Sequence, residues 1–380
     1  MSRKTKLFNR FPWRPGNRFE VLVDGPLFFS RMLETVARAR AYVFLELYLV
    51  QSGEVANRFI EALTAAAARG VRVHVLLDDF GALGLGASDR QRLVAAGIEL
   101  AFYNRLHWRK RLANLLRNHR KLLVVDGETA FVGGAGITDE FDSSTRPGDD
   151  WRDTMVEIRG PVVADWHELF LTTWRRSGLD PIPLAPPAPH AAANGQRGRV
   201  VASSRLRGQN ITRSVAGRIR SAERRVWIAT AYFVPPRKLR RALKRAAHRG
   251  VDVRLLVPGS HTDHPSIRYA GRRLYTLLLR QRVRILEYQP RFLHAKVVLV
   301  DDWASLGSSN LDRWNLMWNL EANQEVADAG FAQSVAAMLE TDFANAQEIR
   351  ADAWSRRGWR ARLLEAISGV IDRWLRRIGN

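Results

Sequence analysis

A histidine and a lysine stand two residues apart at the head of an apolar run in two places. His119 and Lys121 belong to "NHRKLLVVDGE", and His294 and Lys296 belong to "RFLHAKVVLVDD". Such runs predict buried strands, on which residues two apart share one face. Histidine can act as a neutral nucleophile or a proton donor, and lysine offers a positive charge to a phosphate oxygen. Because burying these groups is costly, their duplication predicts one shared active site.

Each motif also carries an aspartate seven residues after its histidine, Asp126 and Asp301. We group both with the histidines and lysines as candidate catalytic residues of the active site. Their position at the end of the strand favours anchoring the strand-to-turn junction, or the lysine, over attack on a substrate. No cluster of metal ligands is apparent, because "HTDH" at 261–264 is a weak candidate that is more typical of a loop. We therefore expect no metal and no cofactor.

The repeat extends beyond the two motifs and predicts the fold class. In each copy a helix ends at a glycine, where a left-handed cap is cheap, and a β-branched strand follows. Strands that alternate with helices predict α/β halves, each with a mostly parallel sheet. The matching stretches are 39–50 with 223–234 and 61–79 with 241–259.

A proline-rich stretch divides the two copies and sets the expected domain boundaries. Residues 177–199 hold five prolines among small and polar residues, which is typical of a linker. We expect a first domain at 18–176, a second domain at 200–345 and a separate tail at 346–380.

Composition limits the class of protein and its partners. The chain has 380 residues, 46% of them hydrophobic, with no cysteine and a net charge of +22. No apolar stretch approaches the roughly 18 residues of a membrane-spanning helix, and no secretory signal is visible. The absence of cysteine excludes disulfides and fits a cytosolic setting. The basic charge favours a partner rich in phosphate, either anionic lipid or nucleic acid, with mere solubility as the alternative.

With their flanks, the two motifs resemble those of the phospholipase D superfamily, and are most similar to bacterial cardiolipin synthases that lack transmembrane helices. The resemblance covers residues 18–345 and is carried by "HRKLLVVDGETAFVGGAGITDEF", "LHAKVVLVDDWASLGSSNLDRWN" and "NLEANQEV". It implies two tandem phospholipase D-like domains related by pseudo-twofold symmetry, each a mostly parallel mixed sheet flanked by helices. It also implies a two-step phosphatidyl transfer through a phosphohistidine, without a metal.

The resemblance assigns roles within that reaction. The family's usual order makes His119 the nucleophile, and the near-symmetry of the halves leaves His294 open as the alternative. Asp153 in "WRDT" and Glu321 in "NLEAN" occupy the places of carboxylates that orient the histidines, with ordinary salt bridges as the alternative.

The phosphate pocket implied by the resemblance is asymmetric. Ser308 and Asn310 of "GSSN" are expected to contact the substrate phosphate, as the family's residues do. Gly136 of "GGAG" stands where the family usually has asparagine. Backbone amides or water are the candidates to take its place.

The last residues predict a basic amphipathic helix. Apolar residues from Leu363 to Ile378 recur at helical spacing, and arginines flank them. Such a helix suits the plane of an anionic membrane, and packing on the body of the protein is the alternative. Near the start, "FNRFPWRPGNRF" predicts either a second interfacial patch or an arm packed on the first domain.

The favoured function is a cardiolipin synthase-like phosphatidyltransferase that joins a phosphatidyl donor to the hydroxyl of phosphatidylglycerol. Phosphatidylethanolamine is a further candidate substrate, and nucleic acid is the less favoured partner. We expect a peripheral protein on the cytoplasmic face of the bacterial inner membrane, active as a monomer because one chain holds both motifs. The alternatives are a phospholipase or nuclease of the same superfamily, and a non-catalytic phosphate-binding protein.

Overall fold

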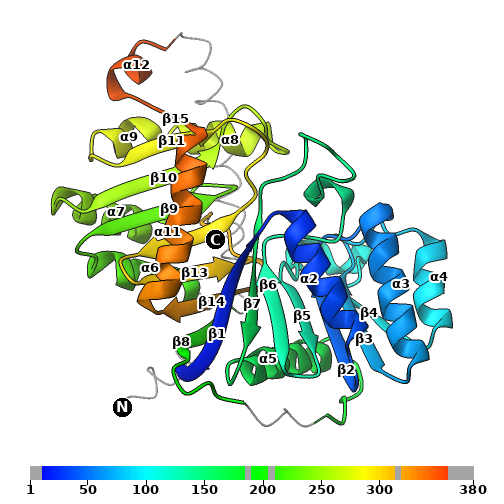
Figure 1. Ribbon diagram of the computed structural model, residues 1–380. Coiled ribbons are helices and arrows are strands. Elements are labelled where there is room, and N and C mark those ends of the chain that lie inside the picture. The colour runs from blue at the N-terminus through cyan, green and yellow to red at the C-terminus, as the bar shows by residue number, and fades with distance from the viewer. Residues whose placement is uncertain (1–10, 185–189, 204–209, 313–317, 358–380) are drawn as a thin grey trace.

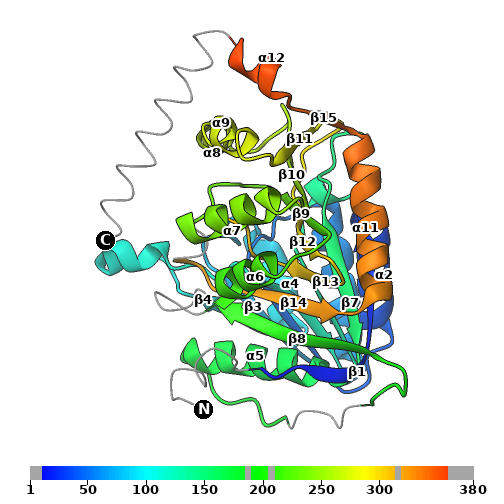
Figure 2. The same cartoon turned by 90° about the vertical axis from the view of Figure 1, so that its left-hand side faces the viewer.

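The computed structural model describes residues 11–184, 190–203, 210–312 and 318–357, and Figures 1 and 2 show its two halves. The first half contains β1 (Arg14–Val23), α2 (Gly25–Ala37), β2 (Tyr42–Leu47), α3 (Glu54–Ala68), β3 (Arg72–Asp78), α4 (Ala87–Ala95), β4 (Glu99–Tyr103), η1 (Trp108–Leu115), β5 (Lys121–Val125), β6 (Thr129–Gly133), η2 (Asp139–Phe141), β7 (Thr154–Arg159) and α5 (Val163–Arg176).

The second half contains β8 (Gln196–Ser203), α6 (Asn210–Arg220), β9 (Arg225–Thr230), α7 (Arg237–His248), β10 (Asp252–Pro258), α8 (Pro265–Arg272), α9 (Tyr275–Leu279), β11 (Arg284–Tyr288), β12 (Lys296–Val300), β13 (Trp303–Gly307), β14 (Glu321–Ala327), α11 (Ala329–Ala344), β15 (Ala346–Glu348) and α12 (Ala351–Ser355).

The strands form one continuous sheet whose order repeats on either side of its centre. From the centre outward the first half runs β1-β7-β6-β5-β2-β3-β4, and the second runs β8-β14-β13-β12-β9-β10-β11-β15. The two halves join where β1 pairs antiparallel with β8. Apart from β15, which has no counterpart in the first half, the two orders correspond strand for strand. The predicted pseudo-twofold arrangement of two α/β halves is therefore confirmed.

The prediction of a mostly parallel sheet is wrong in one respect. Parallel pairs are confined to β2-β3-β4 and β9-β10-β11. The strands that carry and follow the histidine motifs pair antiparallel, as β5-β6-β7 and β12-β13-β14. Helical crossovers make the first sets parallel, whereas a tight turn after each motif strand reverses the chain.

Asp126 and Asp301 lie in those tight turns. Both have left-handed backbone, with φ of 51° and 50°. The Asp126 carboxylate accepts backbone N–H groups from residues 40–42 at 2.8–2.9 Å, and the Asp301 carboxylate accepts those of residues 223–225 at 2.9–3.0 Å. Each aspartate therefore ties its turn to the start of a neighbouring strand. Their grouping with the active-site residues is corrected, because they lie at the end of the strand opposite the lysine.

Helices cover both faces of the sheet. On one face α5 and α11 pack on strands of both halves and share one core, in which Trp166 of α5 donates to Gln324 of β14 at 2.9 Å. On the other face α2, α3 and α4 cover the first half, and α6, α7 and α9 cover the second (Figure 1). The shared core fixes the two motif strands relative to each other.

The proposed linker and tail are described in part. α5 ends at Arg176 and β8 begins at Gln196, while β15 pairs with β11 and so extends the second-half sheet beyond residue 345. The predicted amphipathic helix lies mostly outside the described residues, which end at 357. Among the described helices, none combines the length and the apolar character that crossing a membrane requires.

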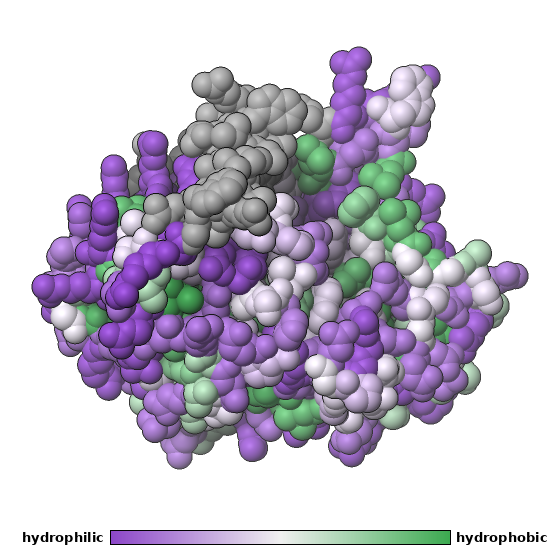
Figure 3. All heavy atoms as spheres, turned by 90° about the horizontal axis from the view of Figure 1, so that it is seen from above, coloured by the Kyte–Doolittle hydropathy of each residue, from purple (hydrophilic) through white to green (hydrophobic). Residues whose placement is uncertain are grey.

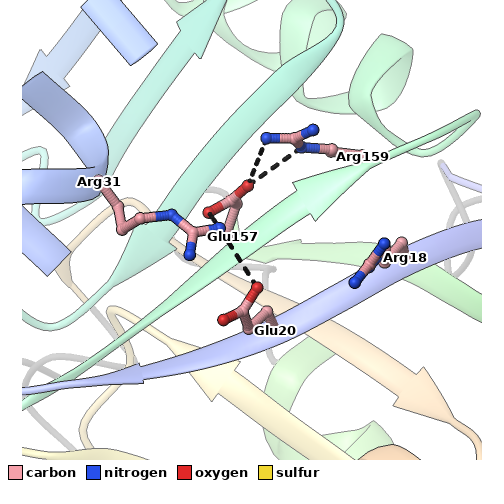
Figure 4. Close-up of a pocket in the computed structure, with 5 residues that line it drawn as sticks. All are labelled: Arg18, Glu20, Arg31, Glu157 and Arg159. Atoms are coloured by element: carbon pink, nitrogen blue, oxygen red, sulfur yellow. Dashed lines mark hydrogen bonds and ion pairs between the residues drawn. The ribbon is translucent and has the colours of Figure 1, made fainter. Parts of the chain in front are cut away.

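One charged cavity of about 140 Å³ lies beside β1 and β7, under α2 (Figure 4). Buried Glu157 accepts hydrogen bonds there from Arg31 at 2.6 Å and from Arg159 at 3.0 Å. Because Glu157 pairs with both arginines, the cavity belongs to a local ion-pair network. It shares no lining residue with the two histidine motifs. Its remaining lining residues are Arg18 and Glu20.

Candidate active site

Both motif lysines stand at the edge of the sheet where the parallel strands end. Lys121 opens β5 opposite Leu47, the last residue of β2, and Lys296 opens β12 opposite Thr230, the last residue of β9. The histidines precede these lysines by two residues, so all four motif side chains lie at one edge. The sheet orders and the tight turns thus build the site from both halves, as the duplication predicts.

Backbone hydrogen bonds attach each histidine to the opposite half. The N–H of His119 donates to the carbonyl of Leu320 at 3.0 Å, and the N–H of His294 donates to the carbonyl of Arg152 at 2.8 Å. In both cases the accepting residue directly precedes a buried carboxylate. The two crossings are equivalent under the pseudo-twofold symmetry, so neither histidine is placed by its own half alone.

The two buried carboxylates, Glu321 and Asp153, face the histidines of the opposite halves. His119 Nδ1 lies 2.9 Å from Glu321 Oε1, and His294 Nδ1 lies 2.6 Å from Asp153 Oδ2. An ionised carboxylate only accepts hydrogen bonds, so each Nδ1 carries the proton and each Nε2 keeps its lone pair. The structure therefore places Asp153 and Glu321 where the sequence predicted, each paired across the halves.

The lysines lie against the histidines in a buried centre. Lys121 Nζ donates to the carbonyl of His119 at 2.7 Å, and Lys296 Nζ lies 3.1 Å from His294 Nε2. Burial lowers the pKa of Lys121 to about 7 and that of Lys296 to about 8. The charge of Lys296 lowers the pKa of Lys121 further, and the charges of both lysines lower the pKa of His294. Burial raises the pKa of Asp153 to about 6. An anion would stabilise the charged form of a buried lysine whose pKa is lowered in this way, so the centre favours an anionic substrate.

Burial also lowers the pKa of both histidines. The Glu321 carboxylate opposes the fall for His119, whereas the charges of Lys296 and Lys121 deepen it for His294, whose pKa lies well below its usual range. Both imidazoles are therefore neutral at pH 7, which is the form a nucleophile requires.

Ser308 and Asn310 lie at the site with different surroundings. The Ser308 hydroxyl donates to Glu321 Oε2 at 2.5 Å, and its carbonyl lies 3.2 Å from His119 Nδ1, so Ser308 holds the His119–Glu321 pair. The Asn310 amide is fully buried, and neither of its polar atoms has a hydrogen-bond partner among the described residues. A buried amide of this kind is costly unless a ligand satisfies it, which favours Asn310 as a phosphate contact.

The first half replaces these two side chains with glycines that leave no room. A Cβ on Gly134, which matches Ser308, would lie 2.4 Å from Asp153 Oδ1. A Cβ on Gly136, which matches Asn310, would lie 2.6 Å from the carbonyl oxygen of Leu49. The asymmetry predicted from "GGAG" therefore has a packing cause, because the first half brings its backbone close to the site.

Aromatic residues around the histidines are functional candidates that the sequence analysis missed. The rings of Phe141, Trp151 and Phe292 lie 5.2–5.7 Å from the His294 ring, centroid to centroid. The Tyr48 ring lies 4.8 Å from the His119 ring, and burial raises the Tyr48 pKa to about 12. These rings place apolar surface against both histidines, which favours the exclusion of water from the reacting atoms.

A tyrosine recurs at matching places in the two copies, and this repetition was the signal available in the sequence. Tyr48 of "LELYLV" corresponds to Tyr232 of "ATAYFV". Tyr232 donates its hydroxyl to Asp263 of the "HTDH" loop. The charge of Asp263 opposes the lowering of the pKa of His294 and of Lys296. Within the described part of the chain, no group of three His, Cys, Asp or Glu side chains is arranged as metal ligands would be.

Arg152 supports the His294 half of the site from behind. Its guanidinium donates to both Asp342 carboxylate oxygens, at 3.0 and 2.9 Å, and to the backbone carbonyl of Asp153 at 2.8 Å. Asp342 belongs to α11, so this buried ion pair ties the cross-half contact to the shared core. Two neutral imidazoles, two lysines and the Asn310 amide around one buried centre can bind a phosphodiester and transfer its phosphorus-bearing group.

A duplicated α/β fold with paired histidines and lysines at its centre defines the phospholipase D superfamily. The chain matches the family model described as "Cardiolipin synthase, PLD-like domain" over residues 32–174 and 215–343. Cardiolipin synthase A of Pseudomonas aeruginosa (strain LESB58) is 39% identical over 343 residues, which cover 89% of the chain and 69% of that protein. Cardiolipin synthase A of Pseudomonas putida (strain W619) is 38% identical over 344 residues, or 90% and 71%.

Solved structures show the same fold at low sequence identity. Phosphatidylserine synthase of Haemophilus influenzae aligns with a TM-score of 0.70 at 13% identity, covering 98% of the chain and 96% of that structure. Polyphosphate kinase of Porphyromonas gingivalis aligns with a TM-score of 0.60 at 16% identity, covering 95% and 53%. The chain belongs to the cardiolipin synthase family of the phospholipase D superfamily, and it is an enzyme of the phosphatidyltransferase type.

Proposed function

We propose that the chain transfers a phosphatidyl group from a donor phospholipid to a hydroxyl of phosphatidylglycerol, which gives cardiolipin. The observation that carries this proposal is the pair of crossed histidine–carboxylate contacts beside two buried lysines. Phosphatidylglycerol or phosphatidylethanolamine serves as the donor. The enzyme acts as a monomer that binds peripherally to the cytoplasmic face of the inner membrane, without a metal or cofactor.

The reaction proceeds in two displacements at phosphorus. In the first, Nε2 of His119 attacks phosphorus, the bond to the donor's headgroup oxygen breaks, and His294 in its protonated form gives its proton to the leaving alcohol. In the second, His294 takes the proton of the acceptor hydroxyl, whose oxygen attacks phosphorus, and the bond to His119 breaks. Lys121, Lys296 and Asn310 stabilise the charge on the phosphate oxygens. Assigning His119 as the nucleophile follows the order usual in the family.

The bound phosphodiester supplies the charge that this cycle requires. His294 is neutral at pH 7 because burial lowers its pKa and the charges of Lys296 and Lys121 lower it further. A phosphodiester anion offsets those charges, which allows His294 to take up the proton that it must donate, while the Asp153 carboxylate stabilises the imidazolium. His119 faces Glu321 instead, so its Nδ1 proton is held and its Nε2 points to phosphorus.

The test compares His119→Ala and His294→Ala on a phosphatidyl ester of p-nitrophenol, whose leaving group needs no proton. We expect neither variant to turn over phosphatidylglycerol. With the activated ester, His294→Ala should release one equivalent of nitrophenol and keep a phosphatidyl adduct on His119, whereas His119→Ala should do neither. Mass spectrometry of the acid-sensitive, base-stable adduct decides the assignment. An adduct on His294 would reverse the roles, and turnover by either variant would refute the two-histidine mechanism.

The same assay separates transfer from hydrolysis. With detergent-dispersed phosphatidylglycerol, the transferase should release glycerol and form cardiolipin in equal amounts, and a chelator should leave the rate unchanged. Release of phosphatidic acid alone would favour the phospholipase alternative, in which water is the acceptor.

A further inference from the structure

Two segments beside the active site expose large apolar side chains to solvent. Among the described residues, eight large hydrophobic side chains are exposed, and five of them lie within 79–86 and 104–116. Trp108 is 77% exposed and Leu83 is 61% exposed. Scattered exposure is ordinary in soluble proteins, whereas a concentration on two adjoining segments is not. The other three exposed side chains on the two segments are Phe80, Leu106 and Leu115.

The topology places both segments at the edge of the sheet that holds the catalytic lysine. Segment 79–86 follows β3 and segment 104–116 follows β4, and these strands run parallel to β2. The end of β2 lies opposite Lys121, so the two segments leave the same edge. A hydrogen bond of 2.8 Å from the N–H of Leu106 to Asp79 Oδ2 joins them. Segment 104–116, cyan, projects from the body on the side of β4 (Figure 2).

Exposed basic side chains stand among the apolar ones. Seen from above, the larger groups of green hydrophobic side chains lie toward the upper right of the molecule, on the half that carries α3 and α4, among purple hydrophilic ones (Figure 3). The Arg109 guanidinium lies 4.9 Å from the Trp108 ring, so cation and aromatic ring are presented together. We call these apolar and basic side chains the rim. Its basic members are Arg105, Arg109, Lys110 and Arg111.

We propose that the rim docks the enzyme on the surface of an anionic phospholipid bilayer, with the active site turned toward the lipid. Tryptophan, leucine and phenylalanine surrounded by arginine and lysine suit the boundary between headgroups and acyl chains. Positive charge adds attraction to anionic headgroups. The inference rests on the proposed function, because a lipid-transferring site at this edge needs its substrate delivered from the membrane plane.

The proposal assigns docking to the folded body, separately from the tail predicted at 346–380. Both segments leave the sheet at the edge that holds Lys121, so a lipid headgroup at the rim has a short path to the motif lysines. Contact of the rim with the membrane then also brings the active site to the lipid surface. Loss of the rim should impair reaction with lipid in vesicles and spare reaction with lipid that detergent delivers to the site.

The test uses the full chain and vesicles of phosphatidylglycerol, with vesicles of phosphatidylcholine as the neutral comparison. The double variants Phe80→Ser with Leu83→Ser, and Leu106→Ser with Trp108→Ser, should each bind anionic vesicles about tenfold more weakly. The matched control carries Leu27→Ser and Val94→Ser, which remove exposed apolar side chains on α2 and α4, and it should bind as the wild type does. Equal binding by all four proteins would overturn the proposal.

A fluorescent label reports insertion directly, because the natural chain has no cysteine. A single cysteine replacing Leu106, labelled with an environment-sensitive dye, should shift to the blue on phosphatidylglycerol vesicles, and one replacing Val94 should not. No shift at residue 106, or an equal shift at both positions, would refute docking through the rim. A rim variant that alters self-association in light scattering and leaves vesicle binding intact would make the rim an interface between copies instead.

Turnover separates this proposal from the proposed function. Rim variants should lose activity on vesicles and keep activity on detergent-dispersed phosphatidylglycerol. If the wild type turned over neither form of lipid while the rim variants still lost vesicle binding, the proposed function would fail and the docking surface would stand. Rim variants that keep full activity on vesicles would count against the docking surface alone.

Discussion

Replacing Asp153 with asparagine tests whether the crossed carboxylates set the chemistry of the histidines. Oδ2 of Asp153 faces His294 Nδ1 at 2.6 Å, and Oδ1 accepts the N–H of Thr154 at 2.7 Å. Both oxygens therefore accept hydrogen bonds from donors. An asparagine presents one donor nitrogen, which must oppose either the Thr154 N–H or the His294 Nδ1–H, whichever way the amide is turned.

The size of the effect follows from these two contacts. Losing one charge-assisted hydrogen bond in a buried site costs roughly 1.5–3 kcal/mol, and leaving a buried donor without an acceptor costs about 1–3 kcal/mol. If most of this falls on the transition state, kcat should drop by about 10²–10⁴. A matching loss is known where an asparagine forces a catalytic histidine into the wrong tautomer, at about 10⁴.

The assay is steady-state turnover of detergent-dispersed phosphatidylglycerol, with KM measured separately from kcat. The matched control is Asp126→Asn, which alters an aspartate of the same motif that lies in a turn away from the site. The control should lower the free energy of unfolding and leave kcat of the folded enzyme nearly unchanged. If Asp153→Asn kept kcat within about threefold of the wild type, the carboxylate would be a structural ion pair and the tautomer argument would be wrong.

The sequence predicted those residues of the site that belong to the duplicated motifs. His119 and His294, with their lysines, stood out because the same pattern recurs in matching surroundings. The duplication also implied that the two copies meet around one centre, and the mirrored order of strands confirms this arrangement. Repetition is informative because each half must supply a histidine and a lysine to the same shared site.

Features that differ between the halves could not be predicted so well. The contact of Gly136 with Leu49 depends on how closely two backbone segments approach, which no local pattern encodes. The aromatic wall around His294 is assembled from segments more than a hundred residues apart. The antiparallel pairing within each half of the sheet was not predicted, because an alternation of helices and strands indicates only the parallel units. The turns at Asp126 and Asp301, which reverse the chain, were recognised only as junctions.

Three further substitutions test the energetics of the site. Lys121→Met should abolish turnover and raise the melting temperature near pH 6–7, because burial depresses the lysine pKa from 10.5 to about 7 and so disfavours the charged form in the folded state. Since the unfolded chain binds the extra proton between about pH 7 and 10.5, wild-type stability rises across this window, and the variant's advantage in thermal unfolding should shrink toward pH 10; an advantage that does not change with pH would contradict this account. Gly136→Asn restores the side chain usual in the family, yet its Cβ would lie 2.6 Å from the Leu49 carbonyl oxygen. We expect it to lower the free energy of unfolding by about 1–3 kcal/mol in urea, and to lower activity as well. The reverse change, Asn310→Gly, removes a buried amide that has no partner among the described residues, so it should reduce turnover with little loss of stability. If Gly136→Asn instead folded normally and gained activity, the first half would have room for a second asparagine, and packing would not be the cause of the asymmetry.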